Sequence, residues 1–278
     1  MPILNDKAWK YPITPSGRAS LLDLVTEPSH RISGDMTIIS FDADPAVVSA
    51  YTPAPMVPEG SGRVYLWNYE GWHYNDRMAT EFVSEKRLQY CESYFMLPCT
   101  LNGEEYLYML YSWVNRDWLA VLGRTAGMPH KVADVLFTHF HEADAEYGGL
   151  RAGARQFISV ENIGLVLRAS VKFERECGTA GLPMRFTNDY CPRHLGRRHF
   201  WDVCNSRPLV DDLVAHWGDE MELGPVWTGP ATLQFFEAEN EEVLPFQPLR
   251  VNNGWRFTLN FTHSTSPPVV IHDYVARG

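Results

Sequence analysis

The chain has 278 residues, of which 45% are hydrophobic and 21% are charged, a balance typical of a folded protein with a real core. Its formal net charge of −10 argues against nucleic acid or an anionic membrane surface as the main partner. Five cysteines at scattered spacings favour free thiols in a reducing compartment over a disulfide framework. Since no apolar run approaches the roughly 18 residues that span a bilayer, we expect a cytoplasmic protein.

The first part of the chain predicts an irregular segment followed by one strand and one helix. Residues 1–35 are polar and are expected to be irregular. Residues 36–41 are rich in β-branched and aromatic side chains, which favour a strand. Asp44 followed by Pro45 is typical of a helix start, because the Asp side chain caps the first turn and Pro has no backbone N–H to leave unpaired.

Strands dominate the sequence from residue 64 onward. The dipeptide Asn102-Gly103 separates two of them and is a strong signal for a tight hairpin. Segment 132–142 is compatible with either a helix or a strand, and segment 210–214 with a strand or a short helix. Strands are expected at 64–69, 88–96, 106–111, 162–173, 231–236, 254–261 and 269–274.

Many short strands with tight turns and few long helices predict an α+β, mostly β fold. We expect an antiparallel sheet that closes as a barrel or cone, with a few short helices. No linker interrupts the pattern, so the prediction is a single domain over residues 1–278.

Lys131 stands out because only five lysines occur in the chain. It lies in the sequence Gly-Met-Pro-His-Lys at 127–131, shortly after an apolar run at 118–122. A lysine against apolar surface and beside another potentially cationic side chain has a lowered pKa, and its neutral amine attacks carbonyl groups. The alternative interpretation is a surface lysine in a turn after a proline.

Three segments along the chain form an ordered set of motifs. Tyr-Cys-Glu-Ser occurs at 90–93, and Ala-Val-Leu-Gly-Arg at 120–124 leads to Pro-His-Lys at 129–131. Trp-Thr-Gly-Pro begins at 227, and Val-Ile-His-Asp-Tyr occurs at 270–274. The set resembles the acetoacetate decarboxylase superfamily over roughly residues 36–278. The resemblance implies an acetoacetate decarboxylase-like β-barrel or cone, a strand at 120–124, and a lyase that acts on a keto acid or polyketide-like carbonyl compound.

The resemblance also implies which residues react. The superfamily's Tyr-x-Glu-Ser glutamate points into the active site and corresponds to Glu92. In the superfamily's Pro-Lys-Lys motif the first lysine forms a Schiff base and the second lowers its pKa, whereas here these positions hold His130 and Lys131. Either Lys131 has become the Schiff-base amine with His130 as its neighbour, or Lys131 keeps the electrostatic role and the amine chemistry is absent.

Five further residues are candidates for substrate binding. A second superfamily carboxylate falls at Trp67, and the nearest acid is Glu70. The aromatic side chains around Trp67 would suit a ring-containing or extended apolar substrate, and plain core packing is an equally open alternative. The candidates are Arg124, Tyr90, Trp67, Trp227 and Glu70.

Three function hypotheses follow from these residues. In the first, Lys131 forms an iminium for decarboxylation or aldol and dehydration steps while Glu92 transfers the proton; this requires Lys131 to lie within a few ångströms of Glu92 in the same cavity. In the second, His130 and Glu92 act as an acid–base pair in a cyclase, isomerase or dehydratase without a Schiff base. The third is a non-catalytic ligand-binding member of the fold. We expect no cofactor, no metal, no nucleic-acid or membrane partner, and a homo-oligomer that binds a small carbonyl substrate.

Two other polar clusters are set aside. His139 and His141 have the i, i+2 spacing of a zinc loop. The acid of such a loop is displaced by one residue here and its third histidine is absent, so we interpret the two histidines as surface or interface residues. The basic cluster within 193–199 could hold a carboxylate or a phosphate. It is more typical of a solvated face or an oligomer contact.

Overall fold

The computed structural model describes residues 30–74, 89–141, 143, 146, 148–186, 192–216, 218–263 and 269–275. Most of the segment 1–35 lies outside these residues, and residues 30–35 belong to the first strand, which corrects their expected irregularity. The described part has two short helices, α1 (Pro45–Ala50) and α3 (Asp117–Thr125), and 3-10 turns at Thr179–Gly181 and Leu244–Phe246. The predicted mostly β class is therefore confirmed, and a single domain over the whole chain stays a prediction.

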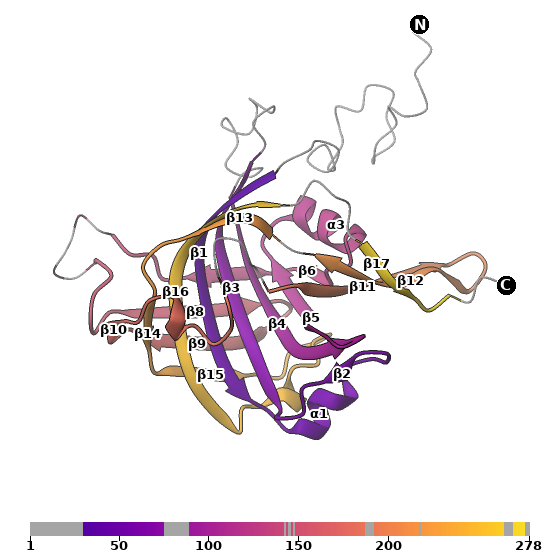
Figure 1. Cartoon of the computed structure of the whole chain (residues 1–278), viewed down its shortest axis with the longest axis horizontal. Coiled ribbons are helices and arrows are strands. Elements are labelled where there is room, and N and C mark those ends of the chain that lie inside the picture. Colours follow the sequence, from indigo (N-terminus) through magenta and orange to yellow (C-terminus); the bar gives the residue numbers. More distant parts are fainter. Residues whose placement is uncertain are drawn as a thin grey trace, which may run out of the picture.

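Five long antiparallel strands form the centre of the main sheet (Figure 1). They pair in the order β16, β1, β3, β4, β5. Asn102 and Gly103 join β4 to β5 with φ angles of 54° and 83°, the left-handed conformation that a tight hairpin needs, so the predicted hairpin is confirmed. The strands are β1 (His30–Asp42), β3 (Arg63–Tyr74), β4 (Gln89–Leu101), β5 (Glu104–Val114) and β16 (Arg250–His263).

Shorter strands extend this sheet on both sides. Its order is β10-β14-β16-β1-β3-β4-β5-β11-β12-β17, with β13, β2 and β6 paired to β16, β4 and β5. Within the described residues the two end strands do not pair, so the sheet is an open cone and not the closed barrel that was one expectation. The short strands are β2 (Val57–Pro58), β6 (His130–Val132), β10 (Arg175–Glu176), β11 (His194–Asp202), β12 (Arg207–His216), β13 (Gly218–Leu223), β14 (Trp227–Gly229) and β17 (Val269–Asp273).

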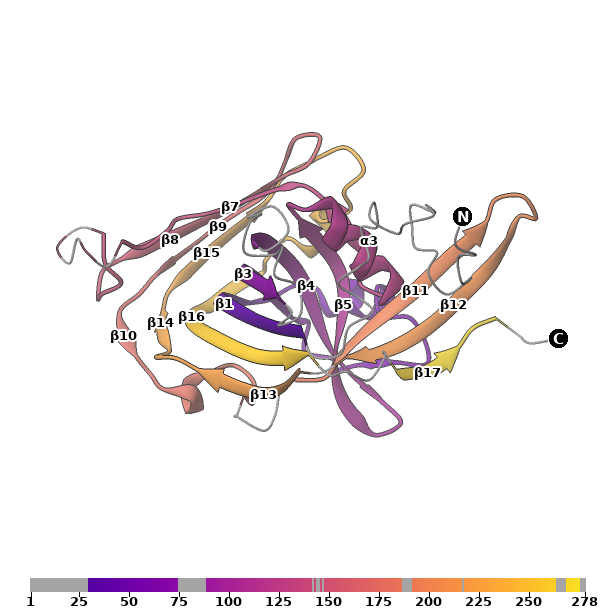
Figure 2. The ribbon, with the colours of Figure 1, turned by 90° about the horizontal axis from the view of Figure 1, so that it is seen from above.

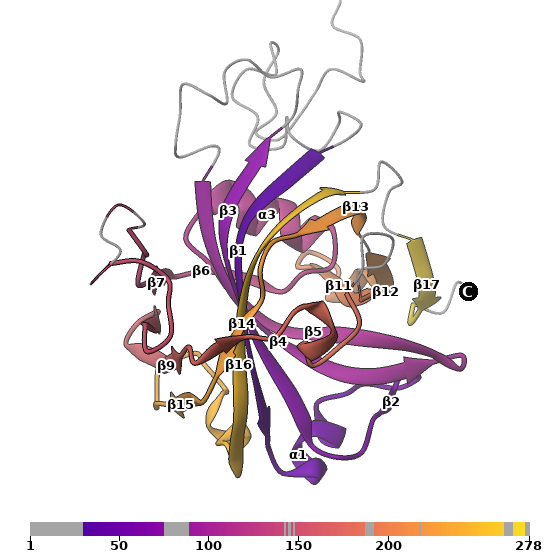
Figure 3. The same cartoon turned by 60° about the vertical axis from the view of Figure 1, so that its left-hand side comes forward.

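A second, four-stranded sheet crosses the main one (Figures 2 and 3). Its order is β15-β9-β8-β7, so the expected strand at 231–236 belongs here and not in a single common sheet. The strand expected at 162–173 begins only at Leu165, because Ile163 and Gly164 turn the chain with φ angles of 40° and 115°. The strands are β7 (Asp134–Phe137), β8 (Arg155–Glu161), β9 (Leu165–Lys172) and β15 (Ala231–Phe235).

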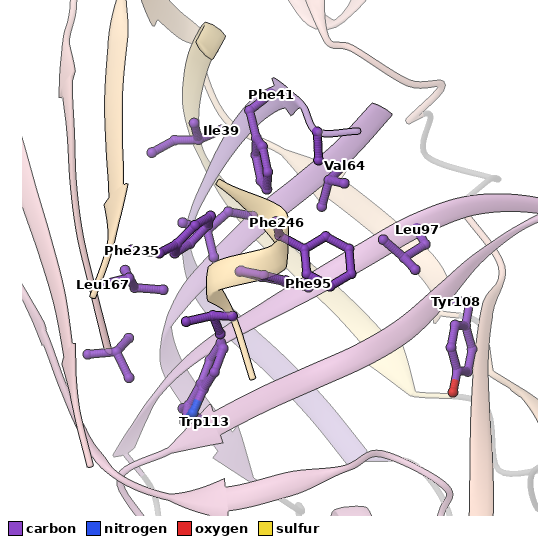
Figure 4. Packing of buried hydrophobic residues seen from close by; sticks show 14 of the residues in the cluster. Ile39, Phe41, Val64, Phe95, Leu97, Tyr108, Trp113, Leu167, Phe235 and Phe246 are labelled. Carbon is purple, nitrogen blue, oxygen red and sulfur yellow. The ribbon is translucent and has the colours of Figure 1, made fainter. Parts of the chain in front are cut away.

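Each face of the main sheet has its own hydrophobic core. Because successive side chains of a strand point to opposite faces, Phe95 of β4 enters the core between the two sheets, while Tyr94 and Met96 enter the other. We call the first the intersheet core; its rings, including Phe41, Phe95, Phe235 and Phe246, are packed together in Figure 4. The second, the helix-side core, is covered by α3 and by the segment around Leu182 and Phe186.

The two helices follow different signals. At α1 the Asp44 carboxylate accepts a hydrogen bond from Ala46 N at 2.8 Å, so the predicted cap is confirmed. At 120–124 the implied strand is wrong, because these residues lie in α3. The helix buries Trp118, Leu119, Ala120 and Gly123, a helical spacing that places them against the helix-side core.

The basic cluster within 193–199 lies mostly on a ribbon of β11 and β12 that projects from the body (Figure 2). Arg197 and Arg198 each make two hydrogen bonds to the facing acids of β12, Asp211 and Asp212. These charges are therefore neutralised within the ribbon. Separately, none of the helices in the described ranges has the length and apolar character needed to cross a membrane.

Candidate active site

Glu92 lies in β4 and points toward the helix-side core. Strand alternation places it on the same face as Tyr90 and Tyr94, which belong to that core, and its partner across β3 is Tyr69. Its side chain is only 11% exposed. Burial raises the pKa of Glu92 to about 8, although a hydrogen bond from Ser112 acts in the opposite direction. Glu92 is therefore mostly a protonated acid at neutral pH.

Ser112 joins Glu92 to His130. The parallel pairing of β5 and β6 places Ser112 beside His130. Ser112 Oγ donates to Glu92 Oε1 at 3.0 Å and lies 2.7 Å from His130 Nδ1, while the Nδ1–Oε1 distance is 3.5 Å. Burial, together with the charges of Arg124 and His216, lowers the pKa of His130 to about 3. The three side chains form a buried chain of neutral groups.

Helix α3 packs against His130 and bonds to its backbone. A Cβ atom on Gly123 would lie 1.8 Å from His130 Cδ2, so only glycine at this position lets the helix approach the ring. The next residue, Arg124, donates from Nε to the backbone oxygen of His130 at 2.8 Å. Arg124 is therefore placed as a support of β6, and its own side chain is exposed.

Lys131 points away from Glu92. It follows His130 in β6, so its side chain projects from the opposite face of the strand. Its Nζ donates to the backbone oxygen of Asn240 at 2.6 Å and to Glu241 Oε2 at 3.1 Å. The prediction that Lys131 lies within a few ångströms of Glu92 in one cavity is wrong, and His130 is the residue of this motif that faces Glu92.

The remaining candidates divide between the two faces of the sheet. Tyr90 and Trp67 belong to the helix-side core, on the face of Glu92. Glu70 follows the cross-strand partner of Glu92 and so points to the other face, where its carboxylate lies 3.2 Å from His139 Nδ1. Trp227 packs against the intersheet core. The structure therefore does not bring Glu70 and Trp227 together with Glu92.

Trp67 is surrounded by other rings. Its ring centroid lies 5.8 Å from that of Tyr94 and 5.5 Å from that of Phe186. The side chain is 1% exposed, and within the described ranges its Nε1 has no hydrogen-bond partner. These contacts are those of a core residue on the face that carries Glu92.

Sequence reasoning missed Ser112 and Gly123. Ser112 is the one small polar residue in the run Tyr-Ser-Trp-Val, and a small polar residue inside a buried strand is a signal that could have identified it. Gly123 offered no comparable signal, since its role depends on the close approach of α3 to His130. Across the described ranges, no group of three or more His, Cys, Asp or Glu side chains is arranged to hold a metal ion.

Comparisons with known proteins identify the family and the fold of the chain. A family model described as acetoacetate decarboxylase (ADC) matches residues 10–275. The enduracididine biosynthesis enzyme MppR, solved with the condensation product of pyruvate and imidazole 4-carboxaldehyde, is 21% identical, with a TM-score of 0.83 over 96% of this chain and 97% of that chain. An acetoacetate decarboxylase-like enzyme from Sphingomonas wittichii RW1 is also 21% identical, with a TM-score of 0.83 over 95% and 98% of the two chains.

A more distant structural match carries the family's own name. Acetoacetate decarboxylase from Legionella pneumophila subsp. pneumophila str. Philadelphia 1 is 17% identical, with a TM-score of 0.71 over 90% of this chain and 89% of that chain. No curated protein sequence matches the chain. Because the family model covers nearly the whole sequence and the solved structures share the fold, the chain belongs to the acetoacetate decarboxylase family.

Proposed function

We propose that this protein is an enzyme that transfers protons to and from a small keto acid or a related carbonyl compound, with Glu92 as the acid and base and without a Schiff base at Lys131. The observation that carries the proposal is the buried Glu92 carboxyl, bonded to Ser112 at 3.0 Å with His130 behind it. A carboxyl that ionises near neutral pH can both give and take a proton during one turnover.

The pKa of Glu92 suits both directions of transfer. With a pKa of about 8, roughly a tenth of Glu92 is ionised at pH 7. The protonated form can donate to a carbonyl oxygen or to a departing hydroxyl group. The carboxylate can remove a proton from the carbon next to a carbonyl. Enolisation, dehydration and aldol steps all use this pair of transfers.

The contacts of Lys131 argue against an iminium at this residue. Its ammonium group is held by the Glu241 carboxylate and by a backbone oxygen on the far side of β6 from Glu92. Both hydrogen bonds hold the amine on the face of β6 opposite Glu92, whereas an iminium assisted by Glu92 needs a free amine on the same face as that carboxyl. The residue at the position facing Glu92 is His130, whose side chain is fully buried.

The choice of keto acid as substrate class rests on the solved relatives. MppR has been solved with pyruvate, and with a condensation product of pyruvate and an aldehyde. The apolar, aromatic face around Glu92 supports a neutral reaction environment in this chain, because burial is the main cause of its raised pKa.

The test is an exchange assay in heavy water with pyruvate, acetoacetate and phenylpyruvate as probes. Proton NMR monitors the replacement of the probe's protons by deuterium. We expect the protein to accelerate exchange next to the carbonyl of at least one probe. Glu92→Gln should slow it by roughly 100-fold or more, while Lys131→Met should keep it. Borohydride treatment with the same probes should leave the intact mass unchanged. A reduced adduct on Lys131, or full exchange by Glu92→Gln, would overturn the proposal.

A further inference from the structure

The proton positions in the chain from Glu92 to His130 follow from the chemistry of Ser112. A serine hydroxyl has one proton to donate. Ser112 donates this proton to Glu92 Oε1 at 3.0 Å. Ser112 Oγ must therefore act as the acceptor in its second hydrogen bond, which comes from His130 Nδ1 at 2.7 Å. A neutral imidazole carries one N–H. Neutral His130 therefore has its proton on Nδ1 and a lone pair on Nε2.

His130 has no contact through which it could reach a substrate directly. Its side chain is 0% exposed, and one edge of the ring lies against Gly123. Its Nε2 has no hydrogen-bond partner in the part of the chain that the structure describes. The charged or titratable groups around it are Glu92 of β4, at 3.5 Å from Nδ1, Arg124 of α3 and His216 of β12. The shortest contact of the ring is the 2.7 Å one to Ser112 Oγ, while Glu92 Oε1 lies 3.5 Å from Nδ1, so His130 acts on the reaction mainly through Ser112.

We propose that Ser112 is a positioning residue for Glu92, and that His130, as the tautomer protonated on Nδ1, fixes the direction in which the Ser112 hydroxyl donates. The proposal rests on the proposed function of Glu92. With Oε1 occupied by the Ser112 hydroxyl, Oε2 is the oxygen that exchanges its proton with the substrate. His130 keeps its own proton throughout and never becomes an ion.

The groups around Glu92 make this role measurable as a titration. Tyr69 of β3 and Tyr90 of β4 face it, and burial holds both phenol pKa values well above their usual range. Both tyrosines and His130 therefore stay neutral between pH 6 and about 9, while Glu92 ionises. Within this setting the Ser112 hydroxyl stabilises the carboxylate form, because it donates to an oxygen that is negative only in that form.

The experiment is a carbon-13 NMR titration of the glutamate carboxyls in the full chain without substrate, with the Glu92 signal assigned by Glu92→Gln. Wild type should titrate at about 8. Ser112→Ala should titrate roughly one pH unit higher, because a hydrogen bond to the carboxylate is lost. Ser93→Ala is the matched control: Ser93 is also buried, but it donates to Asn68 Oδ1 on the other face of β4. It should leave the titration of Glu92 unchanged.

Two further readouts separate this role from a structural one. Nitrogen-15 NMR should show His130 protonated on Nδ1, and Ser112→Ala with His130→Asn should titrate like Ser112→Ala alone. If the double variant does not fold, Ser112→Ala against Ser93→Ala still decides. An unchanged Glu92 titration in Ser112→Ala, or a proton on Nε2 of His130, would overturn the positioning role. A wild-type Glu92 that titrates in the ordinary carboxyl range would instead remove the proposed function itself.

Discussion

Replacing Lys131 by methionine separates the structural role of this residue from a chemical one. In the structure Lys131 Nζ lies 3.1 Å from Glu241 Oε2, and Asn162 Nδ2 donates to the other oxygen of the same carboxylate at 2.8 Å. The Glu241 side chain is fully buried, while that of Lys131 is 38% exposed. The ion pair therefore links β6 to the segment that carries Glu241.

The size of the effect follows from this mixed burial. Removing one partner of a buried ion pair costs about 3–5 kcal/mol, since the other charge stays buried and unpaired, whereas an exposed pair contributes about 1 kcal/mol or less. Lys131 is partly exposed and Glu241 keeps its bond from Asn162, so we expect Lys131→Met to lower the free energy of unfolding by roughly 1–3 kcal/mol. The melting temperature should fall by roughly 3–10 °C.

Urea and thermal unfolding measure the loss, and the deuterium-exchange assay measures the chemistry on the same samples. The second variant Glu241→Gln removes the unpaired charge, so Lys131→Met with Glu241→Gln should recover much of the lost stability. Proton exchange should persist in every variant that stays folded. The reasoning is refuted if Lys131→Met unfolds like wild type but has lost exchange, because the amine would then be needed for chemistry and not for packing.

Three other changes have defined outcomes. The pKa of Glu92 is about 8 in the folded protein, against 4.5 for an ordinary glutamate. The unfolded chain therefore releases this proton first, and wild type should lose stability relative to Glu92→Gln as pH rises from 4.5 to 8. Urea midpoints at several pH values test this, and a constant difference between the two proteins would contradict it. Gly123→Ala should cost roughly 1–3 kcal/mol, because the new Cβ overlaps the His130 ring, and it should also shift the Glu92 titration. Gly103→Ala should cost about 1 kcal/mol in thermal unfolding, since φ there is 83°, with no change at Glu92.

Local sequence signals predicted the local structure well. Asp44 before Pro45 identified a helix start, and Asn102-Gly103 identified a hairpin, because each signal depends on the conformational preferences of one or two residues. The strand at 120–124, by contrast, was implied only by resemblance. There the apolar spacing from Trp118 to Gly123 is the one that a helix needs, and this spacing was the better guide.

The candidate site was predicted in part. Glu92 was identified through the resemblance of its Tyr-Cys-Glu-Ser segment to the superfamily motif, and its burial in an apolar strand agrees with a functional role, because a buried glutamate is costly without a function or a partner. Ser112 and His130 meet Glu92 only through the pairing of β4, β5 and β6, and Gly123 approaches His130 only through the placement of α3. Such long-range contacts cannot be obtained from the spacing of residues along the chain.

The orientation of β6 decides which residue of the His-Lys pair can take part in chemistry. Because neighbouring residues of a strand face opposite sides, placing Lys131 toward Glu92 would turn His130 toward Glu241. An ammonium group would then lie in the helix-side core beside a mostly protonated acid, and the buried Glu241 carboxylate would lose its cation. In the observed orientation the charged pair lies where one partner reaches solvent, and the neutral His130 occupies the fully buried position. Both faces of the strand thus favour the same arrangement, for independent electrostatic reasons, and it is the arrangement that leaves Glu92 with a hydroxyl donor and without an amine.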